Sequence, residues 1–189
     1  MGCDIHAYVE TKREERDWYC ACIPDIGRDY ALFGLLAGVR NKTAESMSPK
    51  GLPIDGISWR TQLAYGLHVY EGGGTVPDEG YCTREDADRW LAAGWSVTIG
   101  DNLISNPDWH TPSWVTVTEL EAVLPKLRDE YDACNRREQE ELEKIATCAE
   151  ERHRSWEYVV SPEIPALIAY MKGFAEAGYD TRLVFWFDN

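Results

Sequence analysis

The stretch CDIHAYVE, residues 3–10, decides the fold of this chain because apolar and polar side chains alternate along it. The odd positions, from Cys3 to Val9, carry the apolar side chains, and the even positions, from Asp4 to Glu10, carry the polar or aromatic ones. Successive side chains of a strand point to opposite faces of its sheet, so this alternation predicts a half-buried β-strand. The odd positions are expected to face the core.

A second stretch, TRLVFWFDN at residues 181–189, reads as a strand that is too apolar to lie at an exposed edge. Residues 18–23 are predicted to form a strand that returns along the first one, after a charged turn at residues 11–17. We therefore predict an α+β fold in which the first and last strands lie side by side in one antiparallel or mixed sheet. Helices are expected on one face of that sheet.

Side chains that cap helix N-termini mark where the helices begin. Asp29 precedes an apolar-periodic segment, and the pairs Thr83/Asp86 and Thr116/Glu119 are spaced as capping boxes. Helices are predicted at residues 30–39 and 84–93, from 117 with a kink or a new start at Pro125, and at 163–177. A solvated helical arm is predicted at about 133–157, and the loops at 41–57 and 106–114 are expected to border a pocket.

The 189 residues carry 19 Lys and Arg against 33 Asp and Glu, a formal net charge of −14. A chain of roughly 150 residues or more buries enough surface to fold without staples, so one domain over residues 1–189 is expected. The charge argues against a protein that wraps a long nucleic acid, because phosphate binding needs a basic footprint. Neither a membrane span of about 20 apolar residues nor a secretory signal is recognised, so we expect a cytoplasmic protein with reduced cysteines.

The polar side of the first strand holds the first candidate site. Asp4 and His6 lie two positions apart, about 7 Å along a strand, and imidazole with carboxylate suits Zn or Mn ions. A metal held there could activate water for hydrolysis. Glu10 lies too far along the strand to join without a bulge. The alternative is that these side chains are simply the wet face of an antiparallel strand.

A second candidate site is the segment DWHTPSW, residues 108–114, which leads into a capped helix. Trp109, His110, Ser113 and Trp114 could stack on a base or a sugar and form hydrogen bonds with it. The alternative is that the two indoles cap the core while the hydroxyls hold the loop.

A third candidate is a basic pocket formed by Arg28, Arg40 and Lys50. The two arginines bracket the first predicted helix, and Lys50 lies in the loop that follows. Guanidinium groups suit bidentate phosphate binding. The alternative is that all three are ordinary surface residues.

Several motifs are spread over the whole chain. They are MGCDIH at residues 1–6, RDYALF at 28–33, LAGVRN at 36–41, GLP at 51–53, the His110–Trp114 segment and FWFD at 185–188. Together they resemble a family of small uncharacterised proteins encoded by bacteriophages and prophages. The corresponding box of that family reads His-Ser-His-Ser-Trp-Leu-Thr, and here Pro112 stands where the second histidine would be. This departure weighs against a metal site.

The resemblance implies an accessory protein that acts against immunity in the host cytoplasm. One interpretation is a binder without a cofactor that sequesters a small anionic, nucleotide-derived signal, using Arg28, Arg40, Trp109, His110, Ser113 and Trp114. The 8 Trp and 10 Tyr of the chain favour it, since these side chains give rigid stacking surface. A second interpretation is a metal-dependent hydrolase or phosphodiesterase with Zn or Mn on Asp4, His6 and His110. A third is an acidic inhibitor that imitates nucleic acid and binds a host defence protein. A homo-oligomer is compatible with each.

Overall fold

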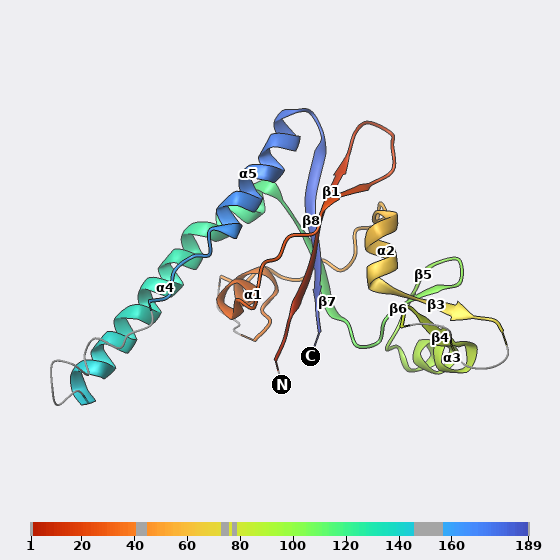
Figure 1. Cartoon of the computed structure of the whole chain (residues 1–189), viewed down its shortest axis with the longest axis horizontal. Helices are drawn as coiled ribbons and strands as arrows, with labels where there is room; N and C mark the ends of the chain where they lie inside the picture. The colour runs from red at the N-terminus through yellow and green to blue at the C-terminus, as the bar shows by residue number, and fades with distance from the viewer. Residues whose placement is uncertain (1, 41–44, 73–75, 77–78, 146–156, 189) are drawn as a thin grey trace.

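The computed structural model describes residues 2–40, 45–72, 76, 79–145 and 157–188, and these form two four-stranded sheets with accompanying helices (Figure 1). The first sheet contains β1 (Ile5–Lys12), β2 (Tyr19–Cys22), β7 (His110–Thr116) and β8 (Asp180–Phe187) in the order β2-β1-β8-β7. The second contains β3 (Gly66–Tyr70), β4 (Tyr81–Thr83), β5 (Thr98–Gly100) and β6 (Leu103–Ser105) in the order β4-β3-β6-β5. The helices are α1 (Tyr30–Ala37), α2 (Trp59–Tyr65), α3 (Arg84–Ala93), α4 (Val117–Ile145) and α5 (Glu163–Glu176). The predicted α+β class is confirmed.

Strand β8 lies inside the first sheet, between β1 and β7. It pairs antiparallel with β1 in an unbroken register that runs from Ile5 opposite Phe187 to Lys12 opposite Asp180. All residues from 182 to 187 are buried, as the apolar run predicts. The prediction that the first and last strands lie side by side is confirmed.

One face of the first sheet packs against α1, α4 and α5. Figure 1 shows these helices on one side of the sheet and α2 on the other. The main core combines sheet residues such as Val9 and Phe185 with helix residues such as Leu32, Leu127 and Met171, and all of these are buried. Burying one such side chain contributes about 1.5–3 kcal/mol. Most of the apolar stabilisation therefore lies on this side.

The opposite face of the first sheet is covered as well. Tyr8 and Glu10, which the alternation places on the polar side of β1, are only 8% and 0% exposed. Tyr8 stacks on Trp186 with ring centroids 5.1 Å apart, and Tyr65 of α2 meets the same indole edge-on. The alternative that the even positions are simply a wet face is therefore wrong for the middle of β1.

The second sheet is not predicted by the sequence pattern. Strand β3 follows α2 directly and pairs parallel with β4 and antiparallel with β6. The strands β4 and β6 have three residues each, which is too short for an alternation to be recognised. A separate small core holds this sheet to α3 and contains Leu67, Val69, Cys82, Ala87 and Ile104.

Three predicted helix starts are confirmed by the hydrogen bonds of their capping side chains. Asp29 Oδ1 accepts from the backbone N–H three residues later at 3.0 Å, and the Thr83 hydroxyl accepts from the N–H of Asp86 at 3.0 Å. Thr116 and Glu119 cap each other reciprocally, at 3.2 Å to the Thr116 hydroxyl and 2.8 Å to the Glu119 carboxylate. These bonds satisfy N–H groups that have no partner inside the helix.

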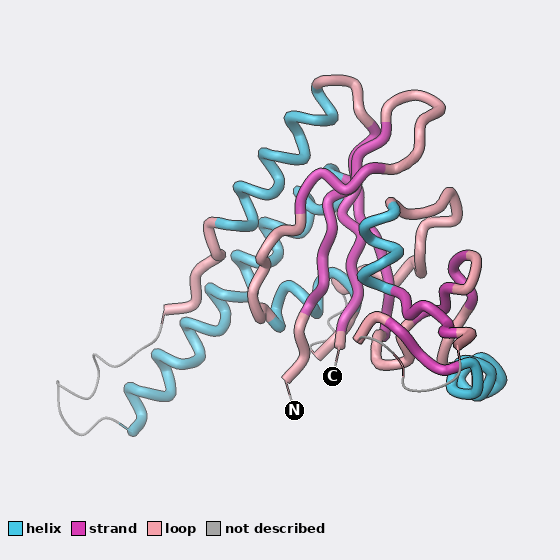
Figure 2. Tube along the Cα trace, turned by 45° about the vertical axis from the view of Figure 1, so that its right-hand side comes forward, coloured by secondary structure: helices cyan, strands magenta, loops and turns pink. Residues whose placement is uncertain are grey.

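One expectation about a loop needs correction, and one about a helix is narrowed. The second half of the expected loop at 106–114 belongs to β7, which begins at His110. Helix α4 runs through Pro125 without a new start and extends away from the sheet (Figure 2). It includes residues 133–145 of the predicted arm, whereas 146–156 lie outside the described residues, as do 41–44 of the other loop. None of the described helices is both long and apolar enough to cross a membrane.

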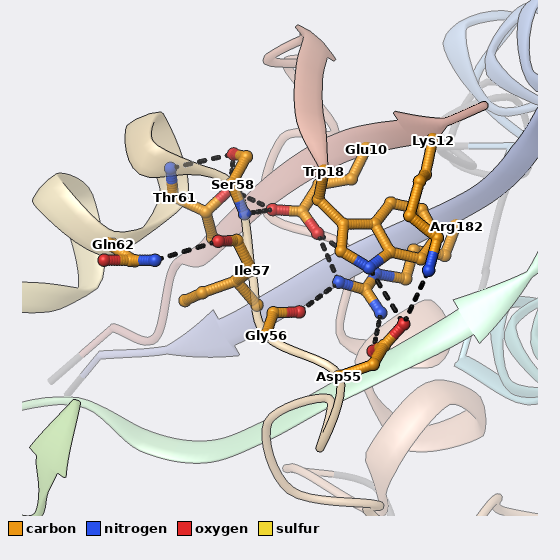
Figure 3. A network of polar contacts seen from close by, with 10 residues as sticks. All are labelled: Glu10, Lys12, Trp18, Asp55, Gly56, Ile57, Ser58, Thr61, Gln62 and Arg182. Carbon is orange, nitrogen blue, oxygen red and sulfur yellow. Dashed lines mark hydrogen bonds and ion pairs between the residues drawn. The ribbon is translucent and has the colours of Figure 1, made fainter. Parts of the chain in front are cut away.

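A buried ion pair lies on the face of the sheet that α2 covers (Figure 3). Glu10 of β1 and Arg182 of β8 are opposite each other in the register, and their side chains are 0% and 4% exposed. Arg182 donates to Glu10 Oε2 from Nη2 at 2.8 Å and from Nε at 3.0 Å. Removing such charges from water costs several kcal/mol per ion, so the pair needs further hydrogen bonds to be stable.

The segment before α2 supplies these hydrogen bonds. The N–H of Ser58 and the hydroxyl of Thr61 donate to the other oxygen of Glu10 at 2.7 and 2.6 Å. Arg182 Nη1 donates to the carboxylate of Asp55 at 2.7 Å. The ion pair therefore joins three distant parts of the chain and fixes the first turn of α2.

Replacing Arg182 with Met is expected to lower the free energy of unfolding by about 3–5 kcal/mol, because Glu10 stays buried without its counter-ion. Urea denaturation followed by circular dichroism measures this loss. The matched control is Arg84→Met, which breaks an exposed pair with Glu71 and should cost less than about 1 kcal/mol. Equal losses in the two variants would contradict a dominant role for the buried pair.

Candidate functional site

Several predicted site residues meet at the end of the first sheet where both ends of the chain lie (Figure 1). We call Asp4, His6, Arg28, His110 and Asp188 the terminal cluster. Arg28 donates two hydrogen bonds of 2.7 Å to the carboxylate of Asp4. His6 Nε2 lies 3.1 Å from Asp188 Oδ2, and His110 Nε2 lies 3.3 Å from the backbone oxygen of Asp188. The backbone N–H of Asp4 donates to Asp188 Oδ1 at 2.8 Å, so Asp188 is the centre of the cluster.

The terminal cluster contains the three predicted metal ligands, Asp4, His6 and His110, but it does not arrange them around a common point. Asp4 is held by Arg28, and the two histidines contact different atoms of Asp188. Within the described ranges, no three His, Cys, Asp or Glu side chains are grouped so that they could hold a metal ion. The geometry therefore gives no support to the predicted metal site.

Arg28 and Arg40 both contact the N-terminal segment. Hydrogen bonds from Arg28 are the largest cause that holds the pKa of Asp4 below its ordinary value, and Asp4 in turn raises the pKa of Arg28. A Cβ atom at Gly2 would come within 2.5 Å of the Arg28 guanidinium, so the glycine makes room for this side chain. Arg40 donates to the backbone oxygen of Gly2 at 3.2 Å. Arg28 is thus engaged by a carboxylate where a phosphate was expected.

Three further predicted ligand-binding residues are also held by internal contacts. The Ser113 hydroxyl accepts from the backbone N–H of Lys50 at 3.1 Å, and the Lys50 ammonium lies 4.0 Å from the ring centroid of Trp114. Trp109 packs beside His6, with ring centroids 4.6 Å apart. Lys50, expected in a basic pocket, instead lies against Ser113 and Trp114.

A hollow of about 530 Å³ lies beside Arg28 and is lined by Tyr30, Tyr131 and Tyr158 among others. Its polar groups have internal partners, since the Tyr131 hydroxyl donates to Asp29 while Arg28 is paired. None of the other five predicted ligand-binding residues lines this hollow. The six predicted ligand-binding residues therefore do not all line this hollow.

A second cavity, where β2 meets α2, is not predicted by the sequence. Its volume of about 430 Å³ is in the range of small-molecule sites. Tyr19 and Trp59 are 71% and 67% exposed, which is unusual for such large rings. We call this cavity the aromatic cleft; it is lined by Trp18, Tyr19, Cys20, Cys22, Ile23, Ser58, Trp59 and Arg60.

The buried ion pair holds Trp18, one of the aromatic residues of the cleft, in place. The guanidinium carbon of Arg182 lies 3.5 Å from the centroid of the indole ring. The indole N–H donates to Asp55 Oδ2 at 2.9 Å, and Figure 3 shows the three side chains together. A ring fixed from two directions loses little entropy when a ligand contacts it.

Arg60 is the charged residue that lines the aromatic cleft. Its side chain is exposed, and within the described part of the chain it forms no ion pair or hydrogen bond. Burial raises the pKa of Cys20 and of Cys22, so both thiols are protonated and neutral at neutral pH. The cleft therefore offers stacking surface together with a cation that has no internal partner there.

Sequence reasoning misses the aromatic cleft because the exposure of a side chain depends on tertiary structure. The available signals are two short pairs far apart in the chain, the aromatic pair Trp18-Tyr19 and the pair Trp59-Arg60. These pairs indicate a common site only when β2 and α2 are known to be neighbours. The terminal cluster, in contrast, is built largely from residues that the motifs single out.

Comparisons with known proteins do not place the chain in a family. No family model, curated protein or solved structure matches it.

Replacing Arg28 with Met is expected to raise the pKa of Asp4 toward the ordinary value for an aspartate, about 3.9. NMR titration of the carboxyl carbon measures the change. Asp55 is the internal control: burial raises its pKa, but hydrogen bonds from Arg182 and Trp18 outweigh burial and lower it, and the substitution leaves these bonds intact. An Asp4 titration that does not move would contradict the pairing with Arg28.

Proposed function

We propose that the protein binds a small ligand that combines a planar ring with a negatively charged group, as a nucleotide does, and that the aromatic cleft is the binding site. The observation that carries this proposal is Arg60, a cation without an internal partner in the described part of the chain, next to exposed aromatic rings. The charge of Arg60 is opposite in sign to the net charge of −14 that the chain carries.

The chemistry of the cleft suits the two halves of such a ligand. A base that stacks on an aromatic side chain gains about 1–3 kcal/mol, and every base has a face that can stack. Trp59 and Tyr19 supply exposed rings, while Trp18 is held in place by Arg182 and Asp55. The guanidinium of Arg60 can donate two parallel hydrogen bonds to one phosphate.

The proposal keeps the sequestration hypothesis but changes its residues. Trp18, Tyr19, Trp59 and Arg60 replace the six residues that the sequence suggested. In the bacteriophage setting that the sequence resemblance implies, a binder of this kind would lower the free concentration of a nucleotide-derived host signal. Imitation of nucleic acid by the acidic surface stays a separate prediction.

Isothermal titration calorimetry of the protein with a panel of mononucleotides and cyclic dinucleotides is expected to detect binding of a ligand. Trp59→Ala should weaken its binding by about 10-fold or more, because a stacking contact is lost. The matched control is Trp95→Ala, which removes a 64% exposed indole outside the cleft and should leave the affinity unchanged.

The role of Arg60 is tested with a nucleotide and its uncharged nucleoside. Arg60→Ala should weaken nucleotide binding by about 10-fold or more, because a charge-assisted hydrogen bond is worth about 1.5–3 kcal/mol. Nucleoside binding should not change. Arg128→Ala, an exposed arginine of α4 outside the cleft, is the control. A panel without any binder, or equal effects of the cleft variants and their controls, would refute the proposal.

A further inference from the structure

Thr111 has an unusual backbone conformation within a bulge of β7. His110 is opposite Phe187 and Ser113 is opposite Phe185, so β7 has one residue more than β8 over this interval. The φ angle of Thr111 is +52°. Positive φ is rare for a β-branched residue, and the Pro112 that follows disfavours helical conformations of the preceding residue as well.

The bulge and the positive φ of Thr111 bring its side chain into contact with that of His110. Residues in such conformations are energetically costly and are concentrated at functional sites, and bulges redirect side chains next to such sites. Here the bulge places the hydroxyl oxygen of Thr111 2.9 Å from Nδ1 of His110. Both residues are half-buried, so neither is closed off from solvent.

The partners of His110 define which ring nitrogen carries the proton. Nε2 lies 3.3 Å from the backbone oxygen of Asp188, which can only accept, so Nε2 is the donor. In the neutral imidazole Nδ1 then carries the lone pair and accepts from the hydroxyl of Thr111. A hydroxyl that donates to an imidazole whose other nitrogen is held by a third group is the arrangement of an activated nucleophile.

The surroundings hold this arrangement in position. The His110 ring stacks on Phe187 with centroids 5.9 Å apart and an interplanar angle of 25°. Asp188, which orients His110, is itself fixed by His6 and by the backbone N–H of Asp4. The terminal cluster thus acts on Thr111 through His110.

We propose that Thr111 is a nucleophile toward activated carboxylic esters, with His110 as its general base. The Thr111 oxygen forms a bond to the carbonyl carbon of the ester while its proton passes to His110 Nδ1. Collapse of the tetrahedral intermediate breaks the bond to the ester oxygen, and the alcohol leaves with the proton from His110. Water then hydrolyses the acyl-threonine by the same route, which releases the carboxylic acid and restores the hydroxyl. This activity is independent of the aromatic cleft.

The test uses p-nitrophenyl acetate with the full chain. Wild-type protein is expected to release p-nitrophenolate and to carry an acetyl group on Thr111, located by peptide mass spectrometry. Thr111→Ser keeps the hydroxyl and should keep the acetyl group, whereas Thr111→Val should lose it. His110→Gln should slow acylation by about 100-fold or more, as expected for loss of a general base. Thr118→Val, at an exposed position of α4, is the matched control and should react as the wild type does.

A further variant separates catalysis from folding. Thr111→Gly relieves the positive φ, so its melting temperature should be at least that of the wild type while acylation is lost. The proposal is overturned if wild-type protein forms no adduct at residue 111, if Thr111→Val is acylated at the wild-type rate, or if His110→Gln does not slow the reaction.

Discussion

The ion pair between Glu10 and Arg182 is the interaction on which the rest of the structure depends. Its two charges lie on neighbouring strands from opposite ends of the chain, and both are almost completely buried. An isolated buried charge is too costly to keep, so each must be matched by hydrogen bonds as well as by its partner. Ser58, Thr61 and Asp55 provide them. The central segment of the chain is therefore fastened to the first sheet by the need to satisfy two charges.

Because of this constraint, the two faces of the first sheet are covered by different kinds of contact. One face is covered by apolar side chains of α1, α4 and α5. Apolar packing in general tolerates hydrophobic exchange as long as volume is kept. The other face is covered by α2 through specific polar contacts together with a cluster of Tyr8, Tyr65 and Trp186. Specific contacts fix orientation more strictly than apolar packing does. The aromatic cleft lies at the margin of this second face, where such control of orientation matters for recognising a ligand.

The sequence predicts those parts of the fold that follow from local patterns. The alternation at residues 3–10, the apolar run at 181–189 and the three capping side chains each correspond to an observed element. The covering of Glu10 and the pairing of the second sheet are not predictable in this way, because they depend on which segments meet in space. The candidate sites follow the same rule. The motifs lead to the terminal cluster, but the partner of Arg28 and the exposure of Trp59 depend on the tertiary structure.

The position of β8 between β1 and β7 also has a consequence for the order of assembly during synthesis. Strand β1 is translated before all the other strands described, but its neighbour β8 consists of residues 180–187 and is translated after them. The first sheet can close only after residues 180–187 have been translated, and contacts of such long sequence separation form slowly. The second sheet draws on residues 66–105 and has its own core, so it can form much earlier. Until β8 arrives, the strand edges of β1 and β7 are open to other pairing, which makes this interval the one in which a nascent chain is most exposed to aggregation.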